Sequence, residues 1–155
     1  MSEARDPLIA VMRSPSAFEA IEARIDAIGA GTTTSVAAGT AELLLLGEAV
    51  LEQWLRAREE VPTRETREGF RVLALHRQGA KGCPSFNACR ETCRELVYHH
   101  NLIVTANDSD AEAHRRLRLM SLVAKHLCLF VAGKMQVAGL GEFCCAAKPM
   151  RADGQ

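Results

Sequence analysis

Apolar side chains recur at intervals of three and four residues along most of this 155-residue chain. The first such run contains Phe18, Ile21, Ile25 and Ile28, and the second contains Leu43, Leu46, Gly47, Val50, Leu51 and Trp54. This spacing gathers apolar groups on one face of an α-helix, whereas a half-buried strand needs a period of two. Because alternating segments are nearly absent, the sequence predicts an all-α fold, a single-domain bundle of five to six helices.

Glycine, proline and short polar clusters interrupt the helical pattern and divide it into segments. The predicted helices span, in order, residues 14–28, 35–60 (or 40–60), 63–78, 84–104 and 109–136, with a short sixth helix at 144–147. No repeat or linker divides the chain, so residues 1–155 are predicted to form one helical domain. Its ordered core is expected to cover about 14–148, with loose tails at 1–13 and 149–155.

The charge balance limits the class of partner. Lys plus Arg and Asp plus Glu both number 19, so the chain lacks the basic excess that phosphate neutralisation requires in a nucleic-acid binder. Its N-terminus is charged, and its apolar runs are shorter than the roughly 20 residues that span a bilayer. We therefore expect a cytoplasmic protein with no nucleic-acid or membrane partner, which binds itself, as in a homodimer, or another protein.

All six cysteines lie after residue 82. Cytoplasmic thiols stay reduced, so these cysteines are expected to be core thiols, metal ligands or redox groups rather than a disulfide framework. Cys89 and Cys93 are four residues apart in a predicted helix, on the same stripe as Leu96 and His100. Helical phasing therefore predicts that Cys89 and Cys93 point inward.

The helix predicted at 109–136 adds a histidine to this pair. Its apolar face is expected to carry His126 among Leu119, Leu122, Val123, Leu129 and Phe130, with Cys128 pointing the other way. An antiparallel hairpin about the turn at 107–108 would bring His126 level with Cys89. Cys89, Cys93 and His126 are thus candidate metal ligands for zinc or an iron–sulfur cluster. The candidates for a fourth ligand are Cys83, Cys144 and Cys145.

Ordinary packing explains the same pattern. Free cysteine behaves as a small hydrophobic residue, and two cysteines at i and i+4 on an apolar stripe are what a helical core produces. The spacing C-x5-C-x3-C matches neither a zinc finger nor a ferredoxin. A third reading is thiol redox chemistry, with Cys93 or Cys89 as nucleophile and His100 or His126 as base.

Three function classes follow from these alternatives. The leading hypothesis is a non-enzymatic binding or regulatory module with a metal or redox site at Cys89, Cys93 and His126. The second is a thiol-dependent, peroxidase-like helical oxidoreductase that uses the Cys89 and Cys93 pair. The third is a structural or interaction protein whose cysteines only fill the core. No catalytic residue beyond these candidates can be read from the sequence.

Overall fold

The computed structural model describes residues 16–31 and 34–139. Its helices are α2 (Ser16–Ala30), α3 (Val36–Ala57), α4 (Arg71–Ala80), the 3₁₀-helix η1 (Pro84–Cys89), α5 (Arg90–Thr105) and α6 (Asp110–Val137). Within these ranges the only β-type pairing is an isolated bridge between Arg67 and Phe70. The predicted all-α bundle is confirmed. None of the helices described is both long and apolar enough to cross a membrane.

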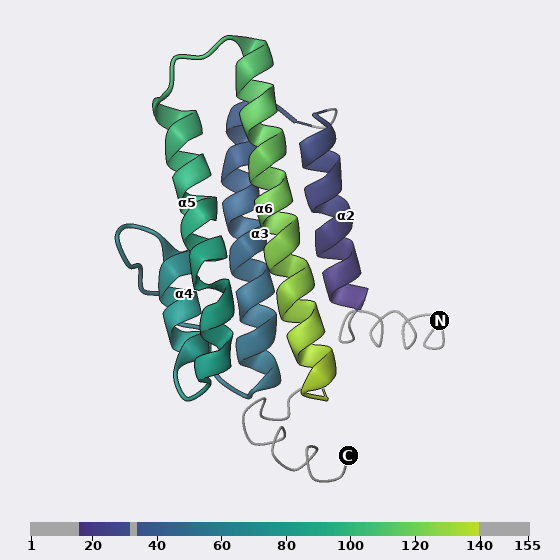
Figure 1. The fold of residues 1–155 in the computed structure, drawn as a ribbon, viewed down its shortest axis with the longest axis vertical. Coiled ribbons are helices and arrows are strands. Elements are labelled where there is room, and N and C mark those ends of the chain that lie inside the picture. The colour runs from purple at the N-terminus through teal and green to yellow at the C-terminus, as the bar shows by residue number, and fades with distance from the viewer. Residues whose placement is uncertain (1–15, 32–33, 140–155) are drawn as a thin grey trace, which may run out of the picture.

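Four long helices form the bundle, with α4 packed beside its lower end (Figure 1). α2 and α5 run in one direction, and α3 and α6 run in the other (Figure 1). α6 contacts α2, α3 and α5, while α4 contacts α3, η1 and α5. α4, η1 and the start of α5 therefore gather beside the C-terminal half of α3.

Two long helices begin at serine caps. The Ser35 hydroxyl accepts a hydrogen bond from the Ala38 amide at 3.1 Å, and the Ser109 hydroxyl accepts one from the Glu112 amide at 3.2 Å. Such bonds satisfy amides that have no partner inside the helix. The starts predicted near 35 and 109 are confirmed.

The third predicted helix is shorter than expected. The sequence predicted it from residue 63, but α4 begins at Arg71, since Glu68 and Gly69 have φ angles of 56° and 87° that interrupt a right-handed helix. Thr63 caps only a local turn, in which its hydroxyl accepts from the Glu65 amide. Residues 59–70 instead form a loop along α4.

Polar contacts hold this loop against the bundle. The Arg71 guanidinium contacts the Glu48 and Glu52 carboxylates of α3 and donates to the Thr63 carbonyl at 2.9 Å. The Gln78 amide bonds the Thr63 amide and the Val61 carbonyl, at 2.8 and 2.9 Å. The loop therefore has a defined position relative to α4.

The predicted inward face of the last long helix is wrong. Leu119, Leu122 and Leu129 are 39%, 59% and 51% exposed, and His126 is exposed as well. The buried face of α6 carries Leu117, Met120, Ser121, Ala124, Leu127, Cys128, Val131 and Met135. Small residues on this face allow close approach: a Cβ on Gly29 of α2 would lie 2.3 Å from the Ser121 hydroxyl oxygen. The buried face therefore combines large apolar side chains with small ones that let α2 approach closely.

The predicted sixth helix at 144–147 and the predicted tails at 1–13 and 149–155 lie outside the described residues. The extent of the ordered core therefore stays a prediction.

Gly79 provides a test of the packing at the end of α3. A Cβ there would lie 2.9 Å from Phe86 Cε2 and 3.0 Å from Trp54 Cδ1, both atoms of stacked rings. Gly79→Ala is therefore expected to lower the free energy of unfolding by about 1–3 kcal/mol. Urea denaturation followed by circular dichroism measures the change.

Gly133→Ala is the matched control. Gly133 lies in α6 with nothing near its hypothetical Cβ. Alanine there should raise the free energy of unfolding by about 0.5–1 kcal/mol through helix propensity. Equal stabilities of the two variants would contradict the close contact at Gly79.

Candidate functional site

The junction of η1 and α5 positions the two central cysteines. Pro84 begins η1, and Cys89 is both its last residue and the N-cap of α5. Cys93 lies one turn into α5. Both side chains are buried, at 1% and 0% exposure, so the prediction that they point inward is confirmed.

An aromatic stack fixes the backbone beside Cys89. The Phe86 ring stacks on Trp54 with a centroid distance of 4.7 Å, and the His76 ring stacks on Phe86 at 5.4 Å. The Phe86 carbonyl accepts a hydrogen bond from His76 Nε2 at 3.1 Å and, in the protonated form of Cys89, one from its thiol at 3.3 Å. Because a carbonyl oxygen only accepts, Nε2 carries the hydrogen. His76 of α4 and Cys89 therefore meet at one oxygen atom.

The two cysteines interact directly and ionise differently. A hydrogen bond from the Cys93 thiol lowers the pKa of Cys89 from 9.0 to about 6, with further help from a His76 hydrogen bond, although burial opposes the shift. The same Cys89–Cys93 bond, together with burial, raises the pKa of Cys93 well above 9.0. Near neutral pH the pair therefore holds one proton and one negative charge.

Cys128 shows what burial does without such neighbours. It is 1% exposed, and its sulfur lies 3.7 Å from the Phe18 carbonyl oxygen. Burial, followed by the charges of Glu22 and Asp26, raises its pKa to about 11. Cys128 therefore stays protonated near neutral pH and, unlike Cys93, has no cysteine of lowered pKa beside it to accept its proton.

The structure does not bring together all the predicted ligands. His126 lies on the exposed face of α6, and His76 takes the place expected for it beside the pair. His100 contacts Phe70 edge-on and hydrogen-bonds Asn101 at 3.1 Å. Among the residues described, no group of three or more His, Cys, Asp or Glu side chains is arranged to hold a metal ion. A metal site formed by Cys89, Cys93 and His126 stays a prediction, and in this structure His126 does not lie beside the two cysteines.

Cys83 also differs from the expectation of reduced thiols. It is disulfide-bonded, whereas Cys89, Cys93 and Cys128 are free. The Cys83 sulfur is thus unavailable as a thiolate ligand in this structure.

The sequence contained a signal for His76 that the prediction did not use. Val72, Leu75, His76 and Gly79 follow the three-and-four spacing of a buried stripe, and all four are buried in α4. A histidine on such a stripe needs a polar partner, and Phe86 provides one. The partner lies ten residues along the chain, so spacing within one helix could not identify it.

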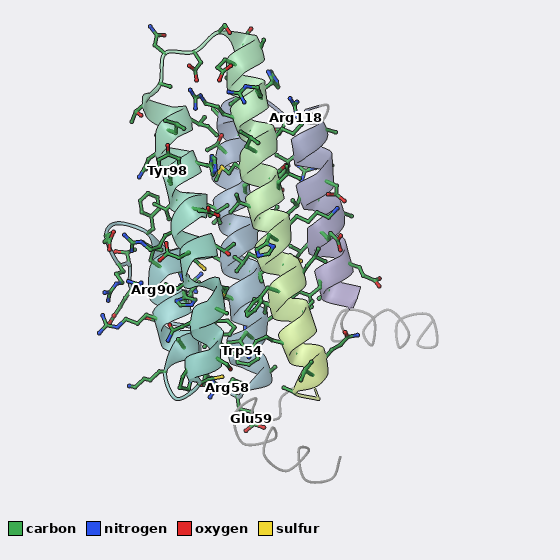
Figure 2. All side chains as sticks on the ribbon, viewed as in Figure 1. Trp54, Arg58, Glu59, Arg90, Tyr98 and Arg118 are labelled. Atoms are coloured by element: carbon green, nitrogen blue, oxygen red, sulfur yellow. The ribbon has the colours of Figure 1, made fainter. Side chains whose placement is uncertain are left out.

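A pocket of about 520 Å³ opens beside the pair, between α4 and the start of α5. Cys93 and His76 both belong to its lining. Arg90, also in the lining, lies on the outer side of the α4 and α5 region (Figure 2). Cys93 borders this pocket although its side chain is 0% exposed, so only a local displacement of the lining would bring a reagent to its sulfur.

Comparison with protein-family models, curated proteins and solved structures finds no match to this chain. The fold and the site define it as an all-α bundle with a buried pair of free cysteines next to a surface pocket.

The shared proton predicts a distinctive titration. Ultraviolet absorbance of the thiolate should reveal one thiol ionising near pH 6 in the reduced protein. Cys93→Ala removes the main hydrogen-bond donor to the Cys89 thiolate, while burial still disfavours that thiolate, so the pKa of Cys89 should rise toward its ordinary value. Cys128→Ala should leave the transition near pH 6 unchanged, because Cys128 ionises near pH 11.

Stability should follow the same ionisation. Cys89 ionises near pH 6 when folded and near 9.0 when unfolded, so the unfolded chain binds more protons between these values. The free energy of unfolding should therefore gain a contribution from Cys89 as pH rises from 6 to 9, and lose it as pH falls. A Cys89 transition near pH 9 or above in the wild type would contradict the hydrogen-bonded pair.

Proposed function

We propose that this protein is a thiol–disulfide redox module in which Cys89 and Cys93 interconvert between a dithiol and a disulfide, with a regulatory rather than a metabolic role. One observation carries the proposal: the two sulfurs are hydrogen-bonded to each other beside His76, and Cys93 lines a pocket. This version of the regulatory hypothesis uses the cysteine pair and replaces His126 with His76.

Packing alone does not account for the electrostatics of the pair. A cysteine that only fills an apolar core has its pKa raised by burial, as Cys128 does. Cys89 is just as buried, yet its pKa is lowered to about 6. Stabilisation of a buried thiolate is typical of reactive cysteines.

The arrangement suits a two-step exchange with a small disulfide RSSR. In the first step Cys93 transfers its proton to the Cys89 thiolate while its sulfur attacks RSSR, which forms a mixed disulfide on Cys93 and releases RS⁻. In the second step the Cys89 proton passes to that RS⁻, and the Cys89 sulfur attacks the Cys93 sulfur and releases a second RS⁻. The dithiol is oxidised by two electrons and RSSR is reduced to RSH and RS⁻, so charge and protons balance.

Closing the disulfide requires a local rearrangement. Side chains at i and i+4 of a helix have Cβ atoms about 5–6 Å apart, whereas a disulfide needs about 3.8 Å. Cys89 is the N-cap of α5, with φ −101° and ψ 12°, so the adjustment falls in η1 rather than inside the helix. Since η1 carries Phe86, oxidation should disturb the aromatic stack. A change in packing of this kind can report redox state to a partner.

Exposure of the reduced protein to bis(hydroxyethyl) disulfide tests the proposal. Digestion and mass spectrometry should find Cys89 and Cys93 joined, with the loss of two hydrogens. Trp54 is the single tryptophan of the chain and stacks on Phe86, so its fluorescence should change on oxidation and recover on reduction.

Single variants separate the roles of the two sulfurs. Cys89→Ser should trap the mixed disulfide on Cys93, because no second thiol resolves it. Cys93→Ser should react slowly, since Cys93 is the sulfur that lines the pocket. Cys128→Ser serves as the control and should behave as the wild type. The proposal fails if Cys89 and Cys93 stay reduced under conditions in which Cys128 is oxidised. Stoichiometric zinc or iron in the purified protein would instead favour the metal hypothesis.

A further inference from the structure

The pocket beside Cys93 is strongly basic in a chain with no formal net charge. Its lining contains five cationic side chains, namely Arg67, Arg77, Lys81, Arg90 and Arg94. Among the described residues that line it, none is an aspartate or a glutamate. The pocket therefore concentrates positive charge at the entrance to the cysteine pair.

Neighbouring carboxylates compensate little of this charge. Arg90 pairs with Glu91 at 3.6 Å and Arg94 with Glu68 at 3.3 Å, with all four side chains more than 40% exposed. Exposed pairs of this kind contribute little, because water screens them. No ion pair formed within the described ranges involves the remaining three cations, Arg67, Arg77 and Lys81.

Some arginines outside the pocket are matched with acids, whereas Arg64 and Arg118 form no ion pair within the described ranges. Arg24 makes a two-point contact with Glu42, at 2.6 and 2.8 Å, and Arg116 lies 2.7 Å from Asp108. The pocket is therefore distinguished by the convergence of five cationic side chains on one hollow, and not by the lack of an acidic partner at any one of them.

The basic groups come from separate parts of the chain. Arg67 lies in the 59–70 loop, Arg77 lies in α4 with Lys81 directly after it, and Arg90 and Arg94 lie in the first turns of α5. A charge run on one solvated helix would not produce this convergence. The Gln78 bonds to the loop hold these elements in place before any ligand arrives.

We propose that the pocket binds the anionic groups of the oxidant, so that the substrate is a small disulfide carrying carboxylates. This inference rests on the proposed redox function of Cys89 and Cys93. Arginine forms two parallel hydrogen bonds with a carboxylate, and a volume of about 520 Å³ is typical of pockets for small molecules. Binding of the carboxylates brings the disulfide bond to Cys93 at the pocket lining.

Three disulfides of similar size and different charge test the selectivity. Dithiodipropionate carries two negative charges, bis(hydroxyethyl) disulfide is neutral, and cystamine carries two positive charges. The rate of Cys89–Cys93 oxidation, followed by Trp54 fluorescence, should fall in that order, by about tenfold or more between the first and the last at low salt. Added salt should reduce the difference.

Matched arginine variants locate the effect. Arg77→Gln removes a pocket cation without an ion pair and should slow oxidation by dithiodipropionate severalfold, while the rate with the neutral disulfide stays the same. Arg118→Gln is the control, because Arg118 is exposed near the upper end of α6, far along the bundle from Arg90 (Figure 2). It should leave both rates unchanged. Equal slowing by both variants would assign the effect to net charge and overturn the inference.

Suberate separates this inference from the redox proposal. It has the length and charges of dithiodipropionate but no disulfide, and its binding to the reduced wild type and to Arg77→Gln is measured by calorimetry. Saturable binding that Arg77→Gln weakens supports the anion pocket, even if no Cys89–Cys93 disulfide forms. Disulfide formation at equal rates with all three oxidants, without suberate binding, would retain the redox proposal and overturn the anion pocket.

Discussion

The stack of Trp54, Phe86 and His76 is the contact on which the site depends. It joins α3, η1 and α4, three elements that the chain connects through loops, and it sets the position of the Phe86 carbonyl. The Gly79 carbonyl fixes Trp54 from the other side, because it accepts from the indole Nε1 and from Arg58, each at 3.2 Å. Trp54 and Arg58 lie together near the lower end of α3 (Figure 2). Without this arrangement, His76 and Cys89 would share no common acceptor.

Local signals in the sequence were sufficient for most of the fold. Ser35 and Ser109 mark helix starts through short-range hydrogen bonds, and the buried stripe of α3 follows from spacing alone. Cys89 and Cys93 were placed inward for the same reason. The start of α4 was missed because positive φ angles at Glu68 and Gly69 depend on the loop's contacts with Arg71 and α3, which no local pattern encodes.

The face of α6 could not be predicted from hydrophobicity. This helix has apolar residues around its circumference, so two faces compete for the core. The larger leucines at 119, 122 and 129 are exposed, and the face with Ser121, Ala124 and Cys128 is buried. The buried face also carries large apolar residues such as Leu117, Met120 and Leu127, so hydrophobicity does not separate the two faces, and its small side chains let α2 pack closely at Gly29. The same rotation exposes His126, which explains why the candidate site required a histidine from another helix.

Cys89 and Cys128 show that burial does not determine the chemistry of a thiol. Both are almost fully buried free cysteines, and the pKa of one is about 6 while that of the other is about 11. Desolvation acts on both in the same direction, so neighbouring groups must account for the difference. Cys89 has the Cys93 thiol and His76 beside it, whereas Cys128 has the negative charges of Glu22 and Asp26 nearby. A spacing rule can place a cysteine in the core, but only the side chains from other helices decide whether it ionises.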